Sequence, residues 1–239
     1  MGDRLKEKVA LVSGAGSSGP GWGNGKATAV LFAREGARVL AVDINFAAAV
    51  ETKRIIEAEG GVCEAVAGDV SRTDDVAAVV DACILAFGRI DVLHNNVGIV
   101  EVGGPVETSE ESWDRVNDVN MKSMFLTCKQ VLPHMVRQGK GAIVNIASVS
   151  GIRWLGVPYI SYATTKAGSS NSPGHRSPIR SVGHTRELDP AGDDEYADGA
   201  RRRGHRRIRR QRGGGSCHPQ VCSREWARCD DTVDRGSRA

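Results

Sequence analysis

Tyr162 and Lys166 stand four positions apart and could together move a proton. On a helix this spacing places both side chains on one face, where the ammonium can approach the phenol. A nearby ammonium stabilises the phenolate and lowers a pKa that is normally about 10, so the phenol could act as acid or base at a carbonyl or hydroxyl. Ser148 lies 14 residues earlier, after a strand-like run, and could hold the substrate oxygen. Without other signals, an exposed Tyr and a solvated Lys on an amphipathic helix would be the simpler interpretation.

A glycine-rich stretch from Gly14 to Gly25 could hold a pyrophosphate. It follows an apolar run over 8–13 and precedes a helical pattern over 26–35. Glycines let the backbone approach the phosphates, and the helix dipole favours their charge. Asp43 ends the next strand-like run, 18 residues after Gly25, and could accept a hydrogen bond from the adenosine ribose. Its carboxylate would repel a 2′-phosphate, which favours NAD over NADP. The alternatives are a flexible turn and a surface Asp at a strand end.

Apolar runs and helical patterns alternate along the first two thirds of the chain. Strands are expected over 8–13, 38–43, 62–67, 90–94 and 142–147, and helices over 26–35, 46–59, 73–88 and 109–137. This alternation predicts an α/β fold with a Rossmann-type, doubly wound parallel sheet and helices on both faces. The residues expected to line an apolar pocket wall, unless they pack only within their own loop, are Trp154, Leu155, Val157 and Tyr159.

Six short motifs follow one another along this region. After the glycine stretch, which begins at Ser13-Gly14, come Gly68-Asp69-Val70, Asn95-Asn96-Val97-Gly98, Val119-Asn120-Met121-Lys122, Ile146-Ala147-Ser148 and Tyr162-Ala163-Thr164-Thr165-Lys166. In this order, each at the end of its expected element, they make residues 1–168 resemble the classical short-chain dehydrogenases/reductases. The resemblance implies an NAD-binding catalytic domain over 1–168. It also implies hydride transfer between NAD(H) and a small-molecule alcohol or ketone.

The resemblance also assigns roles to individual residues. Lys166 would bond the nicotinamide ribose, and Asn120 would hold a water in the proton relay. The family usually forms homodimers or homotetramers through the helix over 109–137 and the helix that bears Tyr162. The implied catalytic residues are Asn120, Ser148, Tyr162 and Lys166. The implied cofactor-binding residues are Gly14, Ser17, Gly23, Gly25, Asp43, Asp69, Val70, Asn96, Gly98, Tyr162 and Lys166, and no metal is expected.

The glycine stretch departs from the family pattern in length. Eight residues separate Gly14 from Gly23, where the family usually has three. The segment 17–22 therefore carries an insertion of five residues. The spacing from Gly25 to the end of the following helix keeps the family pattern, so the insertion precedes the helix.

The composition changes after the Tyr-x-x-x-Lys motif. Residues 167–239 contain 15 Arg, no Lys and only six Val, Ile or Leu. So little apolar surface cannot offset chain entropy, and we expect 169–239 to form an irregular, Arg-rich segment outside the domain. The family's sixth and seventh strands have no counterpart in the pattern. The strand over 142–147 is therefore expected to be an exposed sheet edge.

Three interpretations of this segment differ in what they imply. A run of eight Arg over 201–212 could bind nucleic acid, but no aromatic residues interleave it. Cys217, His218, Cys222 and Cys229 match no standard zinc spacing. Translation of 169–239 out of frame explains more, because a shifted reading of 180–197 permits a family-like strand and Pro-Gly turn. The chain would then bind a dinucleotide but turn over poorly.

The remaining composition favours a cytoplasmic protein without membrane or nucleic-acid partners. No run approaches the ~18 apolar residues that a membrane span needs. The N-terminus has no apolar core of a signal peptide. The six cysteines are then expected to be free thiols, and the net charge of +3 is too small to indicate a partner.

Overall fold

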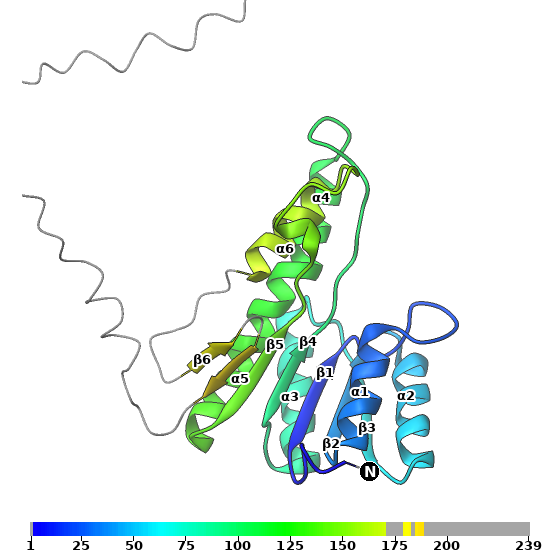
Figure 1. The fold of residues 1–239 in the computed structure, drawn as a ribbon, viewed down its shortest axis with the longest axis vertical. Coiled ribbons are helices and arrows are strands. Elements are labelled where there is room, and N and C mark those ends of the chain that lie inside the picture. The colour runs from blue at the N-terminus through cyan, green and yellow to red at the C-terminus, as the bar shows by residue number, and fades with distance from the viewer. Residues whose placement is uncertain (1, 171–178, 183–184, 189–239) are drawn as a thin grey trace, which may run out of the picture. The chain divides into compact units, whose positions relative to one another are not determined.

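The computed structural model describes residues 2–170, 179–182 and 185–188. Five parallel strands form most of the sheet: β1 (Val9–Ser13), β2 (Arg38–Asp43), β3 (Val62–Ala67), β4 (Val92–Asn95) and β5 (Gly141–Asn145). Their order, β3-β2-β1-β4-β5, reverses direction beside β1 and confirms the predicted doubly wound, Rossmann-type sheet (Figure 1).

Helices cover both faces of this sheet. α1 (Asn24–Arg34) and α2 (Phe46–Ala58) pack on one face through residues such as Val30 and Ile56. α3 (Thr73–Phe87) and α5 (Ser123–Gln138) pack on the other through Val76 and Met135. All five residues of β1 are buried, which explains why this central strand is apolar from Val9 to Val12 rather than alternating.

The helix expected over 109–137 is divided in the structure. It consists of α4 (Glu110–Asn117), a π-helical turn η1 (Asp118–Lys122) and α5. A π-helical turn adds one residue to a helical turn and often marks a functional site. The division cannot be predicted from the apolar pattern, because helical periodicity continues on both sides of the turn.

The Tyr-x-x-x-Lys motif lies on α6 (Ile160–Ser170), which follows a short 3₁₀ helix η2 (Val149–Gly151). α6 begins within two residues of Tyr162, so the expected helix bearing Tyr162 is confirmed.

The expectation that β5 forms an open sheet edge is wrong. β7 (Thr185–Leu188) pairs with β5 in the antiparallel direction, and β6 (Ile179–Val182) pairs antiparallel with β7. Antiparallel neighbours need only a short connection, whereas a parallel neighbour needs a crossover. An edge strand presents unpaired N–H and C=O groups that a short extended segment can satisfy.

The other expectations for the C-terminal segment lie outside the described residues. These are the expectations for the Arg run over 201–212 and for the candidate zinc ligands. The reading-frame hypothesis stays a prediction. The domain boundary expected at 168 stays a prediction. Within the described residues, no helix has the length and apolarity to cross a membrane.

Candidate functional site

The predicted site residues gather at the carboxyl edge of the parallel sheet. β1 leads into the glycine loop, β2 ends at Asp43, β4 is followed by Asn96 and β5 is followed by Ser148. In doubly wound sheets this edge, at the point where the strand order reverses, is where ligands bind. The topology therefore brings together segments that are far apart in the sequence.

The turn from β1 to α1 requires glycine at two of its predicted positions. Gly14 has a φ of 65°, in the left-handed region that favours glycine. A Cβ on Gly25 would overlap the carbonyl oxygen of Gly14 and come within 2.7 Å of the Asn96 amide. The absence of a side chain at Gly25 therefore lets the first turn of α1 pack directly on the loop.

The N-terminus of α1 fits an anionic pyrophosphate. Gly23 is the N-cap and supplies no side-chain hydrogen bond. Among the described residues, none accepts a hydrogen bond from the backbone N–H of Asn24 or Gly25. These donors and the helix dipole are suited to phosphate oxygens. The residues present thus fit a dinucleotide.

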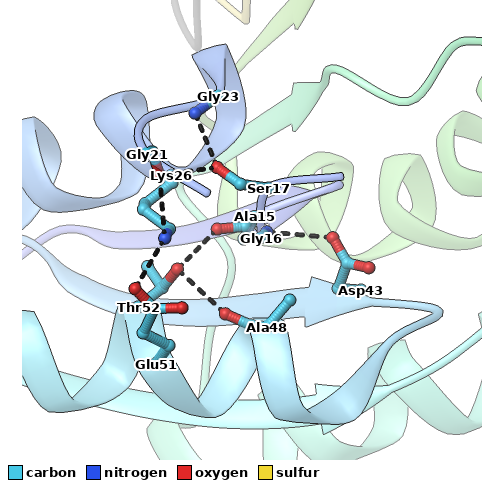
Figure 2. A network of polar contacts seen from close by, with 10 residues as sticks. All are labelled: Ala15, Gly16, Ser17, Gly21, Gly23, Lys26, Asp43, Ala48, Glu51 and Thr52. Atoms are coloured by element: carbon cyan, nitrogen blue, oxygen red, sulfur yellow. Dashed lines mark hydrogen bonds and ion pairs between the residues drawn. The ribbon is translucent and has the colours of Figure 1, made fainter. Parts of the chain in front are cut away.

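Asp43 lies beside the glycine loop, as predicted. Its Oδ2 accepts a hydrogen bond from the Gly16 N–H at 2.9 Å (Figure 2). Its Oδ1 accepts one from the Asn45 N–H at 2.9 Å. A Cβ on Gly16 would stand 2.5 Å from the Ala48 Cβ and 2.8 Å from Asp43 Oδ2. Gly16 is thus a further glycine that the loop requires, and the predicted site omitted it.

Asn96 ties the β4 loop to the glycine loop. Its side-chain amide donates to the Gly14 carbonyl at 3.1 Å, and its backbone N–H donates to the Ser13 hydroxyl at 3.3 Å. The position of Asn96 is therefore compatible with its predicted role beside the cofactor. In this structure its hydrogen bonds hold the two loops together.

The Asp69-Val70 segment is folded into a local turn. Asp69 Oδ1 accepts hydrogen bonds from the backbone N–H and the hydroxyl of Ser71, at 2.9 and 2.7 Å. The Asp69 N–H donates to Asp75 at 3.0 Å, and Val70 is buried. These bonds fix the segment that follows β3.

Asn120 is held on the π-helical turn by three hydrogen bonds. Its Oδ1 accepts from the Ile99 N–H at 2.8 Å, and its Nδ2 donates to the Ile99 carbonyl at 2.9 Å and the Thr165 hydroxyl at 3.1 Å. Thr165 lies on α6, one position before Lys166, so Asn120 links α6 to the loop after β4. Thr165 was not predicted as a site residue.

Lys166 is buried at the centre of the site. Its Nζ donates a 2.8 Å hydrogen bond to the carbonyl of Ile146, directly after β5. A Cβ on Gly98 would come within 3.2 Å of this Nζ and 3.5 Å of Asn120 Oδ1. Burial lowers the pKa of the Lys166 ammonium. The structure thus brings together Gly98, Asn120 and Lys166, which are remote in sequence.

Tyr162 and Ser148 lie beside this cluster. The Lys166 Nζ is 5.7 Å from the centroid of the Tyr162 ring, which confirms that the two share one helix face. The Ser148 hydroxyl accepts from the Ser150 N–H at 3.2 Å. In the described part of the chain, no hydrogen bond joins Ser148 to Tyr162. The structure therefore brings Tyr162 to Lys166 but leaves Ser148 without a direct bond to Tyr162.

An apolar cavity of about 350 Å³ opens between the loop before α6 and the segment Gly104-Pro105. The predicted pocket wall is confirmed, because the cavity lining includes Trp154, Leu155, Val157 and Tyr159. Within the described residues, no cluster of three His, Cys, Asp or Glu side chains could hold a metal ion.

This topology and this arrangement of residues are those of the Rossmann-type oxidoreductases. The short chain dehydrogenase family model matches residues 8–171, and the chain belongs to this family.

Relatives and solved structures agree with this assignment. The chain is 43% identical over 171 residues to the 3-oxoacyl-[acyl-carrier-protein] reductase of Thermotoga maritima, which covers 69% of this chain and 65% of that protein. It is 38% identical over 170 residues to the cyclohexanol dehydrogenase of Acinetobacter sp. strain SE19, with 70% and 65% covered. It therefore spans less than two thirds of the length of these curated relatives.

A structure of a Burkholderia xenovorans protein assigned to the short-chain dehydrogenases/reductases superposes with a TM-score of 0.68 at 49% identity. The match covers 70% of this chain and 66% of the other. A short chain dehydrogenase from Mycobacterium smegmatis gives a TM-score of 0.65 at 35% identity, with 70% of each chain covered.

Proposed function

We propose that the chain binds NAD(H) in preference to NADP(H) and catalyses hydride transfer between it and a small alcohol or ketone. The observation that carries the proposal is the cluster of Gly98, Asn120 and Lys166 beside Tyr162, at the edge of the sheet where the glycine loop also ends. Family membership, and the names of relatives that act on a hydroxyl or keto group, support it.

Asp43 supports the choice of NAD(H). Its carboxylate is fixed beside the loop by the N–H groups of Gly16 and Asn45, and each oxygen keeps acceptor capacity for a ribose hydroxyl. A 2′-phosphate at the same place would face an unpaired negative charge. The remaining predicted cofactor contacts, from Gly14, Ser17, Gly23, Asp69 and Val70, belong to the same proposal.

The bound nicotinamide would supply or accept the hydride, and the protein would handle the proton. In the reduction of a ketone, the Tyr162 hydroxyl gives its proton to the substrate oxygen as the hydride reaches the carbonyl carbon. The Ser148 hydroxyl donates a hydrogen bond to the same oxygen. Lys166 lies beside the Tyr162 ring, where its positive charge favours the phenolate, and a water held near Asn120 returns the proton from solvent. The alcohol oxidation follows the reverse path.

The cavity of about 350 Å³ next to α6 favours a substrate with an apolar body. Trp154, Leu155 and Val157 offer it hydrocarbon surface rather than charge. The family's usual homodimer or homotetramer and the cytoplasmic location expected from the sequence are further parts of this proposal.

A second candidate function is dinucleotide binding with impaired turnover. The observation that favours it is the pair of strands β6 and β7, which joins the sheet beside β5 in the antiparallel direction. In a doubly wound sheet the strand next to β5 would instead run parallel to it. The part of the site that would hold the substrate is formed by residues that follow β5 in the chain. A changed fold in that region would therefore reduce turnover more than it reduces NAD(H) binding.

One experiment separates the two candidates. NADH and NADPH are titrated against the full chain by the change in their fluorescence, and NADH oxidation is then followed with a panel of cyclic and linear ketones. Tighter binding of NADH with turnover that Tyr162→Phe abolishes supports the enzyme. Binding without turnover supports the second candidate, and no binding of either dinucleotide contradicts both.

A further inference from the structure

A buried lysine beside the inserted glycine loop is not used by the proposed chemistry. Lys26 lies in the first turn of α1 and is only 2% exposed. Its Nζ donates to the carbonyl of Gly21 at 3.1 Å and to Glu51 Oε1 at 3.0 Å (Figure 2). Burying an ammonium costs free energy unless the group is paired and hydrogen-bonded. The Gly21 carbonyl and the Glu51 carboxylate offset this cost for Lys26. Lys26 thereby connects the returning limb of the loop to α2.

Ser17 closes the base of the same loop. Its hydroxyl donates to the Gly21 carbonyl at 3.1 Å and accepts from the Gly23 N–H at 2.6 Å. The segment 18–22 between these contacts is an exposed loop, and its Trp22 is 60% exposed. The single hydroxyl proton of Ser17 is engaged with Gly21. Ser17 therefore shapes the loop in this structure.

Both contacts meet at one acceptor, the Gly21 carbonyl. α2 also holds the outgoing limb of the loop, because the Thr52 hydroxyl donates to the Ala15 carbonyl at 2.7 Å. Figure 2 shows the neighbours Glu51 and Thr52 on α2: Thr52 contacts the loop at Ala15, and Glu51 contacts Lys26, which in turn contacts Gly21. The insertion is thus held at its base by Ser17 and by contacts that lead to the helix beneath it.

We propose that Lys26 is a positioning residue for the dinucleotide: with Glu51 it clasps the inserted loop to α2 and so keeps the first turn of α1 open to the pyrophosphate. The inference rests on the proposed NAD(H) binding. Without the clasp, the exposed loop over 18–22 would lose one of the two side chains that hold its return point at Gly21 and would keep only Ser17. The loop would then have to be ordered when the dinucleotide binds, and this cost would appear as weaker affinity.

The test compares NADH titrations of the full chain and four variants. Lys26→Met removes the ammonium but keeps the aliphatic stem, and we expect NADH affinity to fall about tenfold, the scale of a lost charge-assisted hydrogen bond. Glu51→Ala removes the other half of the clasp at a side chain that is 61% exposed, so folding is at little risk. We expect a loss of affinity in the same direction. Glu51→Gln keeps an acceptor oxygen and should bind within about twofold of the wild type.

Lys53→Met is the matched control. Lys53 also lies on α2 and pairs with Glu64 of β3 at 2.7 Å, away from the loop. Its loss removes a comparable ion pair, and NADH affinity should stay within about twofold of the wild type. Hydrogen exchange of the backbone over 17–23, measured without dinucleotide, should be faster in Lys26→Met and Glu51→Ala but unchanged in Lys53→Met.

The outcomes separate this inference from the proposed function. If the wild-type chain does not bind NADH, the proposed function fails and the inference fails with it. If the wild type binds NADH and both clasp variants bind equally well, the inference alone is wrong. Equal losses in Lys26→Met and Lys53→Met would also overturn it, because the effect would then be a general loss of stability.

Discussion

The Lys166 ammonium donates a 2.8 Å hydrogen bond to the carbonyl of Ile146, so helix α6 is fastened to the segment directly after strand β5. Asn120 fastens the neighbouring position of the same helix through Thr165, at 3.1 Å. Both anchors lie before residue 170. Among the described residues, α6 is thus anchored to the end of the parallel sheet and to the π-helical turn.

Replacing Lys166 should damage binding and turnover together. Lys166→Ala removes the Ile146 hydrogen bond, the charge beside Tyr162 and the proposed contact to the nicotinamide ribose. We expect weaker NADH binding and turnover lower by ~10²-fold or more. Fluorescence titration and steady-state kinetics measure the two effects. Lys129→Ala, at an exposed position on α5, is the control and should leave both unchanged.

Replacing Tyr162 should separate binding from turnover. Tyr162→Phe keeps the ring beside Lys166 but removes the hydroxyl that gives the proton. NADH affinity should stay near that of the wild type, while turnover falls by ~10²-fold or more. Full activity in Tyr162→Phe, measured with the same ketone, would mean that another group supplies the proton.

Replacing Asp43 should narrow the preference for NADH. Asp43→Asn keeps an oxygen that can accept from the Gly16 N–H, so the loop stays in place while the charge is lost. The ratio of NADPH to NADH dissociation constants should fall by about tenfold, and Asp43→Ala should change it in the same direction. The control, Asp74→Asn, removes an exposed carboxylate from the first turn of α3 and should leave the ratio unchanged. Tighter binding of NADPH than NADH by the wild type would contradict the assigned role.

The parallel sheet could be predicted because each of its strands is an apolar run that ends where a glycine or polar residue begins. Asp43 and Lys166 could be placed because their motifs sit at strand and helix ends. The Lys26–Glu51 clasp could not be predicted, since a lysine in a first helical turn and a glutamate 25 residues later normally face solvent. The pairing of β5 with Thr185–Leu188 was missed because strands of four residues with charged positions lack a clear apolar alternation.

A buried histidine in β4 should make the protein sensitive to acid. His94 is 4% exposed and lies between Val12 of β1 and Val144 of β5. Its ring packs edge-on against the Phe32 ring, with 5.9 Å between the two ring centroids. Within the described part of the chain, neither ring nitrogen has a hydrogen-bond partner. Burial lowers the pKa of His94 from 6.5 to about 4.

The lowered pKa fixes the sign of the pH dependence. Above pH 6.5 the imidazole is neutral in both the folded and unfolded chains, so its burial carries no ionisation cost. Between pH 6.5 and about 4 the unfolded chain binds a proton that the folded chain rejects, and the free energy of unfolding falls. The loss from this group should reach about 2 kcal/mol at pH 5.

His94→Leu removes the titrating group and tests this dependence. Urea unfolding of the wild type and the variant is compared at pH 7.5 and pH 5, and the variant should gain about 2 kcal/mol relative to the wild type on acidification. His134→Leu is the matched control, because His134 lies on α5 and is only partly buried, so its gain should be smaller. If the difference between His94→Leu and the wild type is the same at both pH values, protonation of His94 does not contribute to the acid sensitivity of the fold.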